Sequence, residues 1–173
     1  LDDPDHLAKT DIADHALEKL RTSNIKEVVL LGRRGIAQAA YTNAEFLAMG
    51  DMAGVDVIID PQELILDSVS TEARDAGTLD STIATKVRIA EEYAEREPTA
   101  GNKRVVFRYL ISPVAIKGSA SGIETIRCAR NEFVYAPDES VDNLDDMPQP
   151  DSGRAAIASS GEGFDLHAGL LMR

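Results

Sequence analysis

Tryptophan is absent from the 173 residues of this sequence, and aromatic residues make up only 5% of it. So few aromatic side chains argue against the stacking platforms with which proteins hold single-stranded nucleic acids. Positive charge is scarce as well, because 18 basic residues stand against 30 acidic ones and leave a net charge of −12. A surface of that sign repels phosphate backbones and anionic lipid headgroups, so we expect no nucleic-acid partner and no membrane partner.

Cysteine and histidine are nearly missing too. Cys128 is the only cysteine, so no internal disulfide can form, and its alternating surroundings predict a small buried hydrophobe rather than a reactive thiol. The three histidines, His6, His15 and His167, lack the spacing of zinc ligands. No apolar run reaches the roughly 20 residues that span a bilayer, and no signal-peptide pattern opens the chain. These absences predict a cytoplasmic location and no metal site.

The first hundred residues alternate between helical and strand-like patterns. Apolar runs typical of strands that are covered on both faces of a parallel sheet occur at residues 28–31 and 54–61. Apolar residues at helical spacing, bounded by plausible caps or stops, occur at residues 10–23, 42–50 and 81–98. The order of these elements predicts an α/β fold built on a parallel sheet.

After residue 100 the pattern changes. Residues 103–118 and 121–136 alternate between apolar and polar positions around a glycine-containing turn, which predicts two antiparallel strands in a β-ribbon excursion. Residues 137–163 are rich in Asp, Pro, Ser and Gly, which predicts a flexible acidic loop. A last apolar run at residues 164–173 indicates another strand. The abrupt end of that run, and the leucine at position 1, favour a piece of a longer protein.

Two adjacent arginines, Arg33 and Arg34, follow the first predicted strand and are a local exception in an acidic chain. In dinucleotide-binding α/β domains a carboxylate at this place bonds the ribose 2′-hydroxyl of NAD, whereas arginine receives the 2′-phosphate of NADP. Guanidinium suits a phosphate because it offers both charge and forked donors. Gly32 and Gly35 on either side would let the backbone turn and approach the phosphate closely. The pair predicts NADP(H) binding, although such a pair is about as often a solvated surface feature.

The glycine fingerprint G-x-G-x-x-G is absent from the stretch before this pair. Either the domain is not of the Rossmann type, or the chain begins after that element.

Several longer strings make a family resemblance visible. "DPDHLAKTDIADHALEKLR", "VVLLGRRGIAQAAYTNAEF", "GVDVIIDPQEL" and "REPTAGNKRVVFRYLISPVAIKG" closely resemble the adrenodoxin-reductase-like ferredoxin–NADP⁺ reductases, including the actinobacterial enzymes. The resemblance covers residues 1 to about 133 and resumes at residue 164. It implies that residues 1–173 are most of an inserted NADP-binding domain. The expected fold is three-layered and Rossmann-like, with a parallel sheet and an antiparallel β-ribbon excursion, and it is incomplete because the glycine-rich loop and the FAD domain are missing.

The resemblance also implies roles for particular residues. Arg33 and Arg34 match the pair that holds the 2′-phosphate, and Glu45 matches a glutamate near the nicotinamide end. Ile36 departs from the proline that is common in the family at that position. The implied cofactors are NADP(H) here and FAD in the parent enzyme, which would pass electrons to a ferredoxin-type iron–sulfur protein. We expect the isolated fragment to be inactive.

Two further interpretations bear on this resemblance. A thioredoxin-reductase-like flavoenzyme would carry a C-x-x-C pair, which is absent. A non-catalytic α/β interaction module, whose arginines bind an acidic partner or no ligand, remains the alternative. A missing first strand would expose a sheet edge, which predicts that the fragment can dimerise through that surface.

Overall fold

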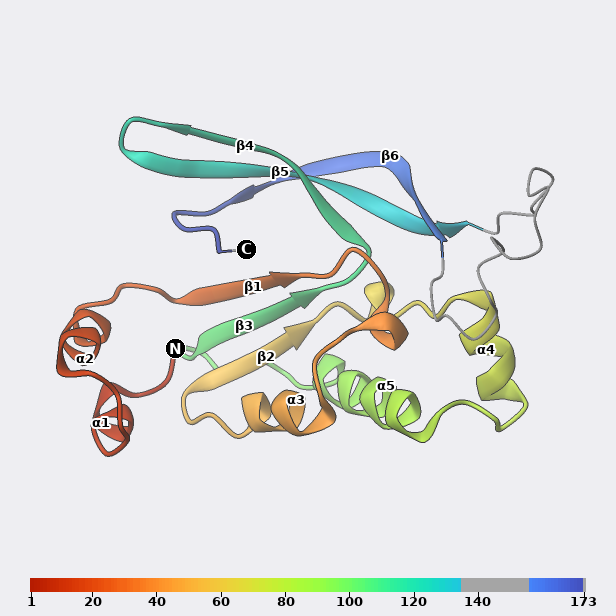
Figure 1. The fold of residues 1–173 in the computed structure, drawn as a ribbon, viewed down its shortest axis with the longest axis horizontal. Coiled ribbons are helices and arrows are strands. Elements are labelled where there is room, and N and C mark those ends of the chain that lie inside the picture. Colours follow the sequence, from red (N-terminus) through yellow and green to blue (C-terminus); the bar gives the residue numbers. More distant parts are fainter. Residues whose placement is uncertain (135–155, 173) are drawn as a thin grey trace.

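The computed structural model describes residues 1–134 and 156–172 (Figure 1). Helices and strands are interspersed up to residue 108, and the described residues after it form strands without helices. The helices are α1 (Pro4–Leu7), α2 (Asp14–Arg21), α3 (Asn43–Gly50), α4 (Ser68–Asp75) and α5 (Ser81–Ala94), with 3-10 turns η1 (Ile36–Gln38) and η2 (Pro61–Glu63). The strands are β1 (Glu27–Leu31), β2 (Val55–Ile59), β3 (Lys103–Arg108), β4 (Ile111–Ser119), β5 (Gly122–Val134) and β6 (Ala156–His167).

The sheet that carries the fold is parallel, with the strand order β1-β3-β2. Every second residue of β2 and β3 is buried, and Val57 lies opposite Val105 in the register. Helices α3 and α5 cover the face onto which these residues point, and the strands β4, β5 and β6 form a further layer beyond β1 (Figure 1). The predicted α/β class, with a parallel sheet and an antiparallel excursion, is confirmed.

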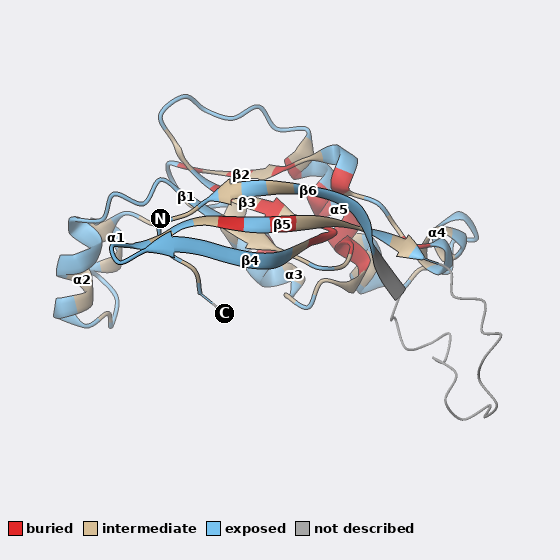
Figure 2. Ribbon diagram, turned by 90° about the horizontal axis from the view of Figure 1, so that it is seen from above, coloured by how far each residue is buried: buried red, intermediate tan, exposed pale blue. Residues whose placement is uncertain are grey.

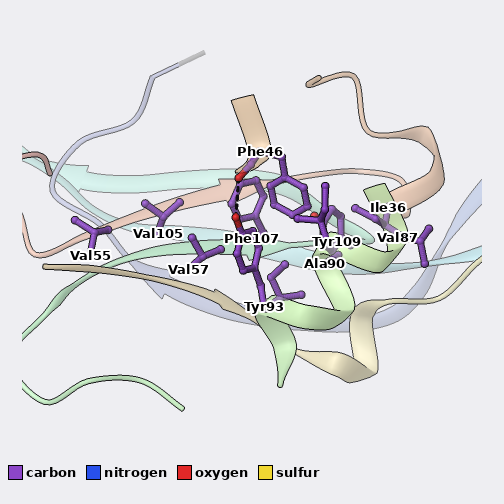
Figure 3. Close-up of a cluster of buried hydrophobic side chains, with 12 residues drawn as sticks. Ile36, Phe46, Val55, Val57, Val87, Ala90, Tyr93, Val105, Phe107 and Tyr109 are labelled. Carbon is purple, nitrogen blue, oxygen red and sulfur yellow. Dashed lines mark hydrogen bonds between the residues drawn. The ribbon is translucent and has the colours of Figure 1, made fainter. Parts of the chain in front are cut away.

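The main core lies between the parallel sheet and helices α3 and α5, and Figure 3 shows its side chains converging around Phe107. The Phe46 and Phe107 rings meet edge to face, with centroids 5.1 Å apart, an arrangement that aromatic quadrupoles favour. The buried members of this core are Ile36, Phe46, Val55, Val57, Ile59, Val87, Ile89, Ala90, Tyr93, Val105, Phe107 and Tyr109.

Gly50, the last residue of α3, is held against the aromatic core. The Tyr93 hydroxyl donates to the carbonyl of Phe46 at 3.0 Å, and an added Cβ at Gly50 would overlap that hydroxyl. We expect Gly50→Ala to lower the free energy of unfolding by about 1–2 kcal/mol, because the overlap outweighs the better helix propensity of alanine. Urea denaturation measures the change. Tyr93→Phe removes the hydroxyl, so a double-mutant cycle should show coupling between the two sites, and strict additivity would contradict the prediction.

The antiparallel sheet has the order β4-β5-β6 and its own small core of Ile111, Ile126 and Cys128. Cys128 is buried there, as its sequence context predicted. Figure 2 shows that burial is concentrated in the parallel sheet, α5 and the middle of β5, whereas most of β4 is exposed. The expectation of one antiparallel strand over residues 103–118 was wrong in its first half, because β3 is the central strand of the parallel sheet. The chain leaves that sheet at Leu110, whose φ is 57°.

Three other expectations differ from the structure. The helix expected over residues 10–23 is shorter, since α2 begins at Asp14, and α4 was not predicted at all. The acidic loop expected over residues 137–163 lies outside the described residues up to position 155, but residues 156–163 belong to β6. That segment pairs with β5 through its backbone, and such pairing overrides the weak strand propensity of its Ala, Ser and Gly residues.

Strand β1 lies at the edge of the parallel sheet, and none of its residues is buried, so the expectation that it is covered on both faces was wrong. Glu27 and Val28 are exposed, and β1 pairs only with β3 among the described strands. Edge strands offer unpaired backbone groups to other chains, and the dimer expected through this surface stays a prediction. Of the helices in the described part of the chain, none combines the length and the apolarity needed to cross a bilayer.

Candidate functional site

The candidate site lies where β1 and β3 end side by side. Because parallel strands bring their carboxyl ends to one edge of the sheet, the segment after Leu31 lies next to the segment after Arg108. We call residues 32–35 the arginine loop. An open cleft of about 340 Å³ is found here, and it contains both predicted arginines. Its lining residues are Leu30, Leu31, Gly32, Arg33, Arg34, Gly35, Gln38, Ala39, Ala40, Tyr41, Phe107, Arg108 and Tyr109.

In the backbone of the arginine loop the carbonyls accept hydrogen bonds from the protein, whereas most N–H groups donate to none of the described residues. The carbonyl of Gly32 accepts from the N–H of Ile111 at 2.9 Å, and that of Arg34 accepts from Leu110 at 3.2 Å. Within residues 1–134 and 156–172, the N–H groups of Arg33, Arg34 and Gly35 donate to no protein acceptor. Successive free N–H groups in a loop are suited to binding an anion.

The side chains of Arg33 and Arg34 are also uncompensated. Neither forms an ion pair with a carboxylate of the described residues; Arg33 is exposed and Arg34 is half-buried. The neighbouring Arg108 contrasts with them, because its Nη2 and Nε donate to the buried carboxylate of Glu63 at 2.6 and 3.0 Å. Among the described residues, the Arg33–Arg34 pair is therefore the part of this cleft whose positive charge has no carboxylate partner.

The two glycines of the loop have different reasons to be glycine. A Cβ at Gly35 would lie 2.8 Å from the Ile65 carbonyl oxygen and 2.8 Å from the Phe133 ring, so this position has no room for a side chain. A Cβ at Gly32 would meet its neighbours at an ordinary 3.5 Å, and its φ is not positive. The expectation that Gly32 is needed for the backbone to turn was therefore wrong, and the close contacts at Gly35 are with the protein itself, so its approach to a phosphate stays a prediction.

Glu45 lies apart from the arginines, outside the residues that line the cleft. It forms a capping box at the start of α3, in which its Oε2 accepts from the N–H and the hydroxyl of Thr42, both at 2.9 Å. These hydrogen bonds hold the pKa of the exposed Glu45 carboxyl below its usual range. Both bonds use Oε2, so Oε1 has no partner within the described part of the chain. The spacing T-x-x-E explains the helix start without any ligand.

Sequence reasoning missed an uncharged aromatic wall of the cleft. The hydroxyls of Tyr41 and Tyr109 bond each other. Burial raises the pKa of Tyr41 to about 12 and holds the pKa of Tyr109 well above its usual range. The buried Lys86 donates to the carbonyl of Ala39, and its Nζ lies 5.2 Å from the centre of the Tyr41 ring. Burial lowers the pKa of Lys86. Only the tertiary fold brings these residues together, because Tyr41 and Tyr109 lie far apart in the sequence.

The cleft thus combines a cationic rim with an aromatic wall that carries no charge. Such a combination suits a ligand with an anionic group and a planar ring. Metal chemistry is not indicated here, since the described residues contain no group of three or more His, Cys, Asp or Glu side chains that could hold a metal ion.

Comparison with known proteins gives consistent matches over most or all of the chain. NADPH-ferredoxin reductase FprA of Mycobacterium tuberculosis is 44% identical over 173 residues, which is 100% of this chain and 34% of that protein. A probable ferredoxin/ferredoxin–NADP reductase of the same species is 32% identical over 158 residues, or 87% of this chain and 24% of the relative. The mitochondrial NADPH:adrenodoxin oxidoreductase of Bos taurus is 34% identical over 124 residues, or 69% of this chain and 25% of the relative.

The solved structures agree with these matches. The structure of Mycobacterium tuberculosis FprA in complex with NADPH superposes with a TM-score of 0.80 at 44% identity, covering 98% of this chain and 33% of that one. No protein-family model matches the chain. The resemblance read from the residue strings is confirmed, and the chain spans about a third of the length of the FprA relatives.

Proposed function

Because this chain is homologous along its whole length to the NADPH-ferredoxin reductases of the FprA type, we propose that it is the NADP(H)-binding segment of a flavin-dependent ferredoxin–NADP⁺ reductase. The enzyme as a whole would work in the cytoplasm, as the sequence indicated, and would act on an iron–sulfur protein. The segment by itself would bind nucleotide and catalyse nothing.

The observation that carries this proposal is the state of the arginine loop. Arg33 and Arg34 lie at the carboxyl edge of a parallel sheet, line a cleft, and have no acidic partner in the described part of the chain. A dianionic 2′-phosphate would gain charge-assisted hydrogen bonds from both guanidiniums and further bonds from the free N–H groups of the loop. A ribose that carries only a 2′-hydroxyl would gain far less from the same groups.

The remaining cleft residues fit the rest of the nucleotide. The half-buried Tyr41 ring, whose hydroxyl bonds that of the buried Tyr109, is uncharged and can lie against a planar ring. Glu45 can keep its helix cap through Oε2 and still offer Oε1 to a ribose hydroxyl or a carboxamide. Its place near the nicotinamide end is part of this proposal.

Little of the chemical step would depend on this chain. When bound, the nicotinamide and flavin cofactors supply hydride and electron transfer between them, and a protein contributes binding and orientation. The residues of this segment would hold the adenosine end by charge and shape. Because the segment would contribute binding and not electron transfer, we expect no oxidoreductase activity from it alone.

Thermal-shift titration with NADP⁺ and NAD⁺ tests the proposal. Binding stabilises the folded state by about 2.7 kcal/mol when the ligand is at a hundred times its Kd, so NADP⁺ should raise the Tm at concentrations at which NAD⁺ does not. 2′,5′-ADP should reproduce the effect of NADP⁺, and 5′-AMP should not. An equal response to both dinucleotides, or to neither, would instead favour the interaction module.

A further inference from the structure

The antiparallel sheet, with the turn that leads into it, holds the backbone of the arginine loop by hydrogen bonds. Three consecutive carbonyls, those of residues 32, 33 and 34, each accept a hydrogen bond from β4, β5 or the turn that leads into β4. The middle bond comes from a side chain, the Nδ2 of Asn131 in β5. We propose that Asn131 is a positioning residue that determines selectivity for the 2′-phosphate, an inference that rests on the proposed function.

The side chain of Asn131 is fixed at both of its amide hydrogens. Its Nδ2 donates to the carbonyl of Arg33 at 2.9 Å and to the hydroxyl of Ser112 at 2.8 Å. Its backbone N–H donates to the carbonyl of Leu110 at 2.7 Å. Asn131 also lies at an irregularity in the pairing of β5 with β6, between Ala129 and Asn131. Such bulges redirect a side chain out of the regular alternation of a strand.

Leu110 donates the hydrogen bond to the Arg34 carbonyl from an unfavourable backbone conformation. It is the one non-glycine residue with positive φ in the described part of the chain, at 57°. That conformation is unfavourable for a branched side chain, so surrounding contacts must enforce it. It lets the Leu110 N–H donate to the carbonyl of Arg34 while its own carbonyl accepts from Asn131. Backbone strain is thus concentrated at the contact between β4 and the arginine loop.

This arrangement determines where the two guanidiniums can reach. With all three carbonyls bound on the side of the antiparallel sheet, the loop cannot rotate its peptide planes to satisfy them elsewhere. Loss of the Asn131 donor would leave the exposed Arg33 carbonyl to bind water instead, so this peptide of the loop would no longer be held in one orientation. Small displacements of a positioned group weaken a geometry-dependent contact strongly. The affected contact would be the one between guanidinium and phosphate, while the rest of the cleft would keep its shape.

The test compares two variants by titration calorimetry with 2′,5′-ADP and 5′-AMP. Asn131→Leu has nearly the same shape but no donor, and we expect it to bind 2′,5′-ADP about tenfold more weakly with 5′-AMP affected less than twofold. Ser112→Ala removes the other partner of the same amide and leaves the bond to Arg33, so it should bind both ligands like the parent chain. Circular dichroism establishes that each variant is folded.

The possible outcomes separate this inference from the proposed function. If the parent chain binds 2′,5′-ADP no better than 5′-AMP, the proposed function fails and the inference fails with it. The inference alone fails if the parent chain prefers 2′,5′-ADP and Asn131→Leu keeps the same preference. It also fails if Asn131→Leu loses affinity for both ligands by the same factor, because Asn131 then has no selective role. Should Asn131→Leu not fold, Asn131→Ser decides by the same ratio, because its shorter hydroxyl should give an intermediate loss for 2′,5′-ADP alone.

Discussion

Replacing Arg33 and Arg34 together by alanine should weaken NADP⁺ binding by at least about a hundredfold and change NAD⁺ binding by less than about threefold. The two guanidiniums have no carboxylate partners within the described residues, so a phosphate would be their main interaction. Hydrogen bonds to charged groups contribute about 1.5–3 kcal/mol each, so losing two of them accounts for the size of the effect. Calorimetric titration of the folded variant with both nucleotides measures it.

Salt and a matched variant serve as controls. The NADP⁺ affinity of the parent should fall as ionic strength rises, since the interaction is between exposed charges, and the affinity of the double variant should not. Arg74→Ala with Arg88→Ala removes the same net charge from helices α4 and α5, away from the cleft. If that control loses as much NADP⁺ affinity, the general field of the molecule and not the arginine loop is responsible.

The elements that surround the arginines could be predicted because local signals define them. The helix expected over residues 42–50 is α3, which begins at Asn43 behind the cap residue Thr42, and the capping box with Glu45 is a detail that the structure adds. The apolar run of β1 and the arginines after it show where the first strand ends. Helix α4 was missed although Asp67 caps it through the N–H of Ser70 at 3.0 Å, because few apolar residues follow at helical spacing.

The support behind the site could not be predicted, because it depends on contacts between distant residues. Residues 103–118 carry a strand-like pattern without a clear stop, so only the break at Leu110 separates a parallel strand from an antiparallel one. Nothing near Asn131 in the sequence indicates that its amide reaches the carbonyl of Arg33. The groups that could bind a ligand could be identified from the sequence, but only the fold shows which residues hold those groups in place.

A buried carboxylate shared by two arginines links the two sheets. Glu63 follows β2, and its side chain is 5% exposed. Its Oε1 accepts from Arg108 of β3 at 2.6 Å and from Arg130 of β5 at 3.3 Å, and its Oε2 accepts from the N–H of Tyr109 at 3.1 Å. The two guanidiniums lie 5.0 and 5.4 Å from the centre of the Phe164 ring on β6. This single carboxylate therefore pairs with two cations that the fold brings together, and its one negative charge offsets half of theirs.

Glu63→Gln should accordingly lower the free energy of unfolding by about 3 kcal/mol, the low end for breaking a buried pair, since the largely buried Arg108 guanidinium loses its counter-charge while the 42%-exposed Arg130 side chain stays hydrated. Glutamine keeps the shape, so packing loss is not the cause, and two guanidiniums would face each other without a counter-charge. Glu92→Gln is the matched control, because Glu92 pairs with Arg88 on the exposed surface of α5, where such a pair contributes less than about 1 kcal/mol. Urea denaturation of both variants measures the change. If the two variants lose equally little free energy of unfolding, the packing of the two sheets does not depend on the Glu63 charge.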